Sequence, residues 1–426
     1  MSSYLAYDCC QCGAEHEPAA VVTRCSSCGF GALDLRHDWD AIKTTINPHE
    51  LGEDPSLWRY SPLLPVTAPS GGPSPLTTVG GTPLLAAQRT SQRLDLGPVW
   101  IKDDGRLPSG SLKDRASAVV VARARELGLD RIATASTGNA GVALAAMAGA
   151  AGMRASVFVP ASAPAAKIAQ LKIFGAELFL VDGNYDDAFR LCEEACEALG
   201  WYSRNTGRNP FTAEGKKTVS YEICEQLTRV APAANSTAPW RAPDRIFVSV
   251  GDGNIITGVH KGFKDLLALG WIDHMPKLIG VQAEGSAAIA NAFEAQSEKI
   301  QTVRANTVAD SIAADSPSDG LRALRAVTET GGIYLTVSDD EILQAIPQLG
   351  HDATVFAEPA AAAAYAGLEK WARGERRISE ETTVVLITGN GLKDVPAAQR
   401  AIAAPTPIAP TLDALRDHLQ STKEDA

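Results

Sequence analysis

The chain has 426 residues, 45% hydrophobic and 21% charged, which is typical of a packed globular protein built from two or three structural units. The formal net charge of -11, with the basic residues scattered singly, argues against a nucleic-acid or anionic-membrane partner. No apolar run approaches the roughly 20 residues that span a bilayer and the N-terminus lacks the pattern of a signal peptide, so we expect a cytoplasmic protein.

Two cysteine pairs mark residues 1–48 as a separate segment. Twelve residues separate the pairs, which are Cys9 with Cys12 and Cys25 with Cys28. Gly13 and Gly29 follow them directly, as tight turns require. This spacing predicts a zinc-ribbon-like segment with a closed, structural four-cysteine site. A ribbon that has lost its metal keeps the same spacing, so a zinc-free ribbon stays an alternative.

Past this segment, residues 51–83 are rich in Pro, Gly and Ser and predict an extended connector. Short apolar runs then alternate with helical patterns. We expect strands at 131–136, 153–160, 176–183, 245–251, 276–285 and 382–389, with helices at 141–152, 165–175 and 186–200. Such runs are typical of parallel sheets buried on both faces. An α/β protein with right-handed crossovers follows, with its ligands at the carboxyl ends of the strands.

The later part of the chain carries three simpler segments. Residues 230–244 predict a surface loop, because they show no periodicity. An alanine-rich packed helix is expected from Pro359 to residue 374. Residues 401–426 predict a linker followed by a short helix capped by Thr411.

Lys113 lies where a turn-forming stretch, "LPSGS", meets an amphipathic helix. A cation in the first turn faces the positive end of the helix dipole, which is unfavourable by about a few tenths of a kcal/mol. A neutral or imine-bonded lysine avoids this conflict, so the position fits a Schiff-base lysine. A solvated surface lysine is the alternative.

Two glycine-containing loops end predicted strands and begin helices. "ASTGNAG" (135–141) and "VGDGNIITG" (250–258) present backbone N–H groups to a carboxylate or phosphate. Neither loop matches the dinucleotide pattern, and "EGKKT" lacks the first glycine of a P-loop, so these nucleotide cofactors are disfavoured. An ordinary tight turn remains the alternative for either loop alone. Thr388, at the end of the last predicted strand, could bond a ring nitrogen.

As a set, these motifs resemble the fold-type II pyridoxal-phosphate enzymes and, among them, the threonine synthase family. The resemblance covers about residues 9–395 through "GGTPL", "PSGSLKDR", "ASTGN", "NPFTAEGKKT", "VGDGNI" and "TGNGLKD". It implies two three-layer domains with parallel or mixed sheets within residues 49–400, the smaller one at about 115–205. It also implies pyridoxal 5'-phosphate, a small amino-acid substrate and a homodimer.

The resemblance implies a role for each matching residue. Lys113 resembles the lysine that bonds the cofactor and shuttles protons, and Asn139 resembles the partner of the pyridoxal 3'-oxygen. Thr388 resembles the residue facing the pyridine nitrogen. The loop that holds the cofactor phosphate matches Gly251, Asp252, Gly253, Asn254 and Ile255. The substrate-binding positions match Ser111, Ser136, Thr137, Gly138 and Thr212.

Two positions depart from the family pattern. Ala140 replaces a threonine, and Thr212 replaces an arginine, that typically help to hold the substrate phosphate. Arg204 or Arg208 could substitute from the same loop. Glu358 and residues 306–320 are expected near the site.

The chain is therefore expected to be a pyridoxal-phosphate lyase of the threonine synthase type, forming L-threonine and phosphate from O-phospho-L-homoserine and water. The departures leave open an ammonia-lyase or β-replacement enzyme acting on serine, threonine or O-phosphoserine. A regulatory zinc-ribbon protein with an inactive enzyme domain is a third alternative, disfavoured because Lys113 and Asn139 are intact.

Overall fold

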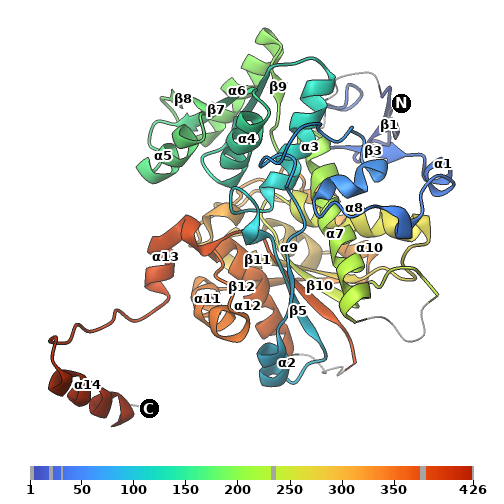
Figure 1. The fold of residues 1–426 in the computed structure, drawn as a ribbon. Coiled ribbons are helices and arrows are strands. Elements are labelled where there is room, and N and C mark those ends of the chain that lie inside the picture. The colour runs from blue at the N-terminus through green and yellow to red at the C-terminus, as the bar shows by residue number, and fades with distance from the viewer. Residues whose placement is uncertain (1–3, 19–22, 30–31, 232–236, 375–379, 425–426) are drawn as a thin grey trace.

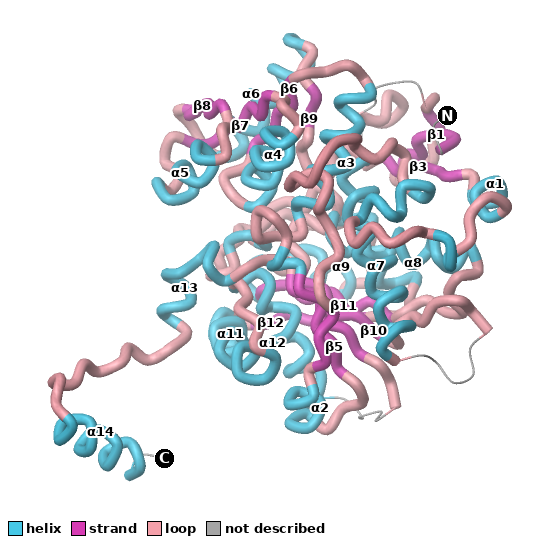
Figure 2. The backbone as a smooth tube through the Cα atoms, in the orientation of Figure 1, coloured by secondary structure: helices cyan, strands magenta, loops and turns pink. Residues whose placement is uncertain are grey.

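The computed structural model describes residues 4–18, 23–29, 32–231, 237–374 and 380–424. Three sheets organise this part of the chain, and Figure 1 shows the two larger ones above and below one another. Figure 2 shows their strands in magenta among the surrounding helices in cyan. Within the described ranges, no helix is both long and apolar enough to cross a membrane.

The larger sheet has six strands in the order β12-β11-β10-β13-β5-β4. All neighbours are parallel except β4, which is antiparallel to β5. The strands are β4 (Leu84–Ala86), β5 (Val99–Asp103), β10 (Arg245–Ser249), β11 (Lys277–Ala283), β12 (Ile333–Val337) and β13 (Thr383–Ile387).

Apolar side chains on both faces of this sheet explain its helical covering. On β10, Ile246 and Val248 belong to one buried cluster, whereas Phe247 belongs to another on the opposite face. The first cluster includes side chains from α7 (Phe211–Val230), α8 (Asn254–Leu269) and α10 (Gly320–Glu329). The second includes side chains from α11 (Asp339–Ala353) and α12 (Pro359–Gly374). The expected three-layer arrangement is confirmed.

A smaller, all-parallel sheet has the order β8-β7-β6-β9. Its strands are β6 (Arg131–Ala135), β7 (Arg154–Pro160), β8 (Glu177–Val181) and β9 (Tyr202–Ser203). Ile132 packs in one cluster with side chains from α4 (Asn139–Ala150), whereas Ala133 packs with α6 (Tyr185–Leu199) on the other face. The α5 helix (Ala165–Ile173) connects β7 to β8. These units follow the predicted alternation.

The N-terminal segment forms an antiparallel sheet of β1 (Tyr4–Cys9), β2 (Glu15–His16) and β3 (Leu33–His37), with β1 in the centre. The remaining helices are short or peripheral: α1 (Trp39–Lys43), α2 (Gln88–Leu94), α9 (Ala288–Glu294), α13 (Val395–Arg400) and α14 (Leu412–Glu424). Thr411 caps α14, accepting a 3.3 Å hydrogen bond from Ala414 N. Figure 1 shows α14 standing apart from the main body.

Helix α7 is almost completely buried and joins the sheets to the site. It packs against α3 (Lys113–Glu126) and α8. Gly215 permits the closest approach, since a Cβ there would lie 2.1 Å from the Arg115 carbonyl oxygen. The packing of α3 and α8 against α7 therefore fixes the position of the N-terminus of α3 relative to that of α8.

The extended connector predicted at 51–83 is wrong in its first half. Residues Leu57–Leu63 form a 3-10 helix whose Tyr60 is buried against Tyr221 of α7, with ring centroids 5.4 Å apart. Trp58 is also buried, and its Nε1 donates to the Leu76 carbonyl at 2.7 Å. Burial of these aromatic rings outweighs the local preference of proline and glycine for extended chain.

The predicted surface loop at 230–244 is likewise wrong at Trp240. This side chain is buried and contacts Trp271, with ring centroids 4.8 Å apart. Residues 232–236 of the same loop lie outside the described residues.

Candidate active site

Lys113 begins α3 beside the end of the last strand, β13. The Leu112 N–H donates to the Thr388 carbonyl at 2.9 Å, and Ser111 forms an isolated antiparallel bridge with Gly389. These contacts join segments almost 280 residues apart in sequence. They fix the lysine next to Thr388, as the carboxyl-end placement of ligand sites predicts.

The Lys113 side chain lines a cavity whose opposite wall is the loop after β10. The cavity is lined by Lys113, Ser249, Val250, Gly251, Asp252, Gly253, Ile255, Ile256, Ser311 and Ile312. Burial lowers the pKa of the Lys113 ammonium, helped by the charge of Arg204 and opposed by Asp252 and Glu358. The neutral amine, which is the nucleophilic form, is therefore easier to reach than in an exposed lysine.

The loop from Gly251 to Ile255 is a close-fitting backbone cradle at the N-terminus of α8. Gly253 has φ of 93°, and a Cβ there would lie 2.7 Å from Ala323 Cβ. A Cβ on Gly251 would lie 2.7 Å from Ile312 Cα. Both positions therefore require glycine, and the helix N-terminus directs backbone N–H groups at an anion. The residues present fit a cofactor phosphate.

Asn139 and Glu358 form a hydrogen-bonded pair in the same site. Asn139 opens α4 and donates from Nδ2 to Glu358 Oε1 at 2.7 Å and to Ser311 Oγ at 3.4 Å. Burial raises the pKa of Glu358 to about 7, against the opposing effects of Lys393, Asn139 and Lys113. Glu358, expected near the site, is thus placed in contact with a predicted cofactor ligand.

The predicted substrate loop, Ser136 to Gly138, connects β6 to α4 and is partly exposed. Gly141 fixes it, because a Cβ there would lie 2.3 Å from the Ser136 carbonyl oxygen. Ser111 has a buried hydroxyl oxygen without a hydrogen-bond partner in the described part of the chain. A bound polar group would satisfy that hydroxyl.

The structure places Thr212 on the inner side of α7, fully buried. Its hydroxyl donates to the Asn209 carbonyl at 2.7 Å and lies 3.3 Å from Asn254 Oδ1. Ala140 is partly exposed and offers no polar group. Of the two arginines considered as substitutes, Arg208 faces Glu193, with Nε and Oε2 3.9 Å apart. Arg204 points inward and is fully buried.

Sequence reasoning missed Lys216, which is fully buried and donates a hydrogen bond to Asn254 in the cradle. The available signal was its spacing. Lys216 follows Thr212 by four residues on a helix, so the two side chains share one face.

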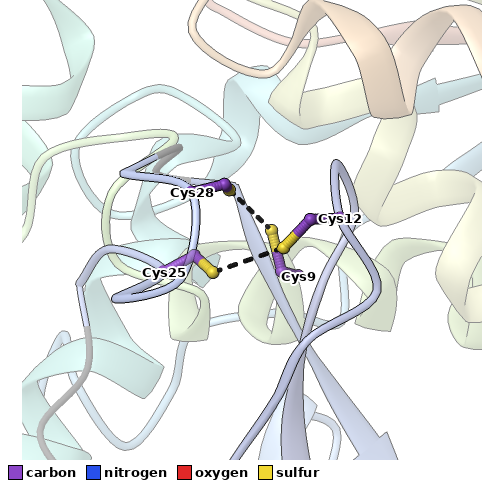
Figure 3. Close-up of side chains that lie close together, drawn as sticks. All are labelled: Cys9, Cys12, Cys25 and Cys28. Carbon is purple, nitrogen blue, oxygen red and sulfur yellow. Dashed lines mark hydrogen bonds between the residues drawn. The ribbon is translucent and has the colours of Figure 1, made fainter.

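The four predicted metal ligands come together at the end of β1, where Cys9 is the last residue of the strand and the other three cysteines lie in loops. Figure 3 shows the four thiols pointing toward one another, and all four sulfur atoms lie within 4.8 Å of each other. The sulfurs of Cys9 and Cys28, and of Cys12 and Cys25, are 3.6 Å apart. Zinc–sulfur bonds of about 2.3 Å at tetrahedral angles give sulfur separations of about 3.8 Å. The cluster therefore fits the geometry of a four-cysteine zinc site.

Residues 76–389 match the family of pyridoxal-phosphate dependent enzymes. The chain is 37% identical to threonine synthase of Methanosarcina acetivorans over 413 residues, covering 96% of this chain and 97% of that protein. It is 34% identical to threonine synthase of Methanocaldococcus jannaschii, covering 96% and 98%.

Solved structures provide a comparison of the fold. The chain superposes on threonine deaminase isoform 2 from Solanum lycopersicum with a TM-score of 0.65 at 22% identity, covering 79% of this chain and 91% of that one. It superposes on L-serine ammonia-lyase from Rhizomucor miehei with a TM-score of 0.63 at 21% identity, covering 75% and 96%.

Proposed function

The chain belongs to the threonine synthase family of pyridoxal-phosphate-dependent enzymes, and from this premise we propose that it converts O-phospho-L-homoserine and water to L-threonine and phosphate. The observation that carries the proposal is the cavity in which Lys113 faces the glycine cradle. Bound pyridoxal phosphate supplies the electron sink that makes the α- and β-protons of an amino acid acidic.

Different residues around the cavity would hold different parts of the cofactor. The backbone from Gly251 to Ile255 would bind its phosphate, and Asn139 would donate to its 3'-oxygen. The uncharged hydroxyl of Thr388 would face the pyridine nitrogen. A neutral partner leaves that nitrogen unprotonated, which favours elimination and replacement over transamination.

Proton movements are assigned to Lys113. The reaction removes phosphate from Cγ and adds water at Cβ, so protons must pass among Cα, Cβ and Cγ. A lysine whose pKa is lowered by burial releases and takes up these protons more readily than an exposed lysine does. The loop from Ser136 to Gly138 would hold the substrate carboxylate beside it, where backbone N–H groups and hydroxyls converge.

The test is a comparison of substrates with the purified holoenzyme. We expect equal amounts of L-threonine and inorganic phosphate from O-phospho-L-homoserine. L-serine, L-threonine and O-phospho-L-serine should give little pyruvate or 2-oxobutyrate. The opposite product pattern would favour the ammonia-lyase or β-replacement alternative, which Ala140 and Thr212 left open. The full-length relatives support the first pattern, because they are threonine synthases at 34% to 37% identity.

We further propose that the four-cysteine cluster binds one structural zinc ion. Metal analysis should find about one zinc per chain, because a closed tetrahedral thiolate site binds zinc tightly. Cys25→Ser should remove the metal and lower the urea concentration at which the chain unfolds. Cys10→Ser is the matched control, since Cys10 lies outside the cluster. A wild-type chain purified without metal, in buffers free of chelators, would contradict this proposal.

The homodimer and the cytoplasmic location expected from the sequence stay proposals.

A further inference from the structure

Arg204 is a fully buried cation that forms no ion pair with any acidic side chain in the described part of the chain. It follows β9, and its Nε donates to Ser117 Oγ at 3.2 Å while Nη1 donates to Thr206 Oγ1 at 2.7 Å. Its Nη2 atom is buried and has no hydrogen-bond partner among the described residues. Burial lowers the pKa of this guanidinium to about 10. A buried charge of this kind is unfavourable unless something neutralises it.

Lys216 is the second such cation. Its ammonium is fully buried and donates a hydrogen bond to the amide oxygen of Asn254 rather than to a carboxylate. The next residue provides the contrast, because Lys217 lies 2.6 Å from Glu214 and 2.9 Å from Asp265. Over the described ranges, Lys216 and Arg204 form no ion pair at all.

Lys113, Lys216 and Arg204 lie close enough for their charges to act on one another. Burial lowers the pKa of Lys216, and the charges of Lys113 and Arg204 lower it further, against Asp252. The Lys216 amide partner, Asn254, opens the helix behind the glycine cradle. Arg204 is adjacent to the substrate loop, because β9 pairs with β6 in parallel and Arg204 N donates to the Ala133 carbonyl at 2.7 Å.

Nearby carboxylates already have other partners. Asp252 accepts from the Asn254 N–H at 3.1 Å, and Asp114 accepts from the Ser109 N–H at 2.6 Å. Asp319 binds Arg322, with Nε and Oδ1 2.6 Å apart. Among the described residues, none of these carboxylates forms an ion pair with Arg204 or Lys216, and a doubly charged anion would give both cations a direct partner.

We propose that Arg204 and Lys216 bind the phosphate group of a phosphorylated amino-acid substrate, in place of the threonine and arginine lost at Ala140 and Thr212. This inference rests on the proposed function for the identity of the amino acid. Two cations at the phosphate stabilise the negative charge that grows as the Cγ–O bond breaks and the phosphate leaves with the bonding electron pair. The phosphate group of the cofactor is the second anion that these two cations could bind.

The test compares Arg204→Met and Lys216→Met with Arg208→Met, whose parent residue lies in the same loop but faces Glu193. We expect each of the first two changes to lower kcat/KM for O-phospho-L-homoserine by about 10- to 100-fold and to weaken binding of inorganic phosphate to the holoenzyme similarly. Arg208→Met should change both by less than about twofold. Thermal unfolding establishes that each variant folds, and Arg204→Lys should recover part of the phosphate affinity.

Cofactor affinity distinguishes the two sources of phosphate. Under the proposal, titration of the apoprotein with pyridoxal phosphate gives the wild-type Kd for Arg204→Met, and the spectral response of that variant to unphosphorylated L-homoserine is unchanged. Lys216→Met, whose parent residue contacts the cradle through Asn254, should weaken inorganic-phosphate binding to the holoenzyme more than it weakens cofactor binding. A weakened cofactor Kd with normal inorganic-phosphate binding to the holoenzyme would overturn the proposal. If the wild type formed no threonine, the proposed function would fail, whereas inorganic-phosphate and O-phospho-L-serine binding would still test the two cations.

Discussion

Lys113→Ala is expected to abolish threonine formation, lowering kcat by roughly 10³-fold or more, and to remove the visible absorbance of the bound cofactor. The structure gives the reason, because Lys113 lines the cavity opposite the glycine cradle. A purified sample measured by absorbance and by phosphate release under saturating substrate checks both expectations together.

Two further variants make this result specific. Lys113→Arg keeps a positive charge but cannot form the Schiff base, so it should behave like Lys113→Ala. Lys370→Ala is the matched control and should keep normal activity. Lys370 lies on α12, outside the residues that line the cavity, and donates to the Thr336 carbonyl of β12 at 2.7 Å. If the lysine at 113 proved dispensable for both absorbance and turnover, the assigned site would be wrong.

Arg115→Met is expected to produce the largest loss of stability, about 3 to 5 kcal/mol in the free energy of unfolding. Arg115 is completely buried, with Nε 2.7 Å from Asp104 Oδ2 and Nη1 2.6 Å from Glu222 Oε1. Lys102 also binds Glu222, at 2.6 Å. Removing the guanidinium leaves the buried carboxylates of Asp104 and Glu222 without their arginine partner. Urea unfolding monitored by circular dichroism measures the resulting loss of stability.

Arg125→Met on the same helix is the control, because Arg125 is exposed. It should change the free energy of unfolding by no more than about 0.5 kcal/mol. Equal unfolding midpoints for the two variants would show that the buried ion pairs contribute nothing net.

Local sequence patterns predicted the fold class and several residues of the candidate site. Apolar runs of five or six residues predicted the parallel strands, and the predicted helix start at Pro359 agrees with α12. The glycines at 251 and 253 pointed to a phosphate cradle, and the structure explains why no side chain fits there. Each of these inferences depends on residues close together in sequence.

Contacts across the chain were harder to predict. Tyr60 lies in a stretch rich in proline and glycine, and only its packing on Tyr221 explains why that stretch is buried. Glu358 and Asn139 are more than 200 residues apart, yet their hydrogen bond joins two sides of the site. Lys216 had no motif of its own, and its importance appears only once its lack of a carboxylate partner is known.

The sequence by itself determined the α/β architecture, the cysteine cluster and the candidate lysine that lines the cavity, because hydrophobic periodicity, ligand spacing and glycine turns act over short ranges. The tertiary structure alone decided which buried charges are paired. Lys217 lies within 3 Å of Glu214 on its own helix and of Asp265 on α8, whereas Lys216 has no carboxylate partner among the described residues. Helix α8 presents Asp265 to Lys217 but the neutral amide of Asn254 to Lys216. Because Coulomb interactions depend on distance in space, sequence neighbours can have opposite roles.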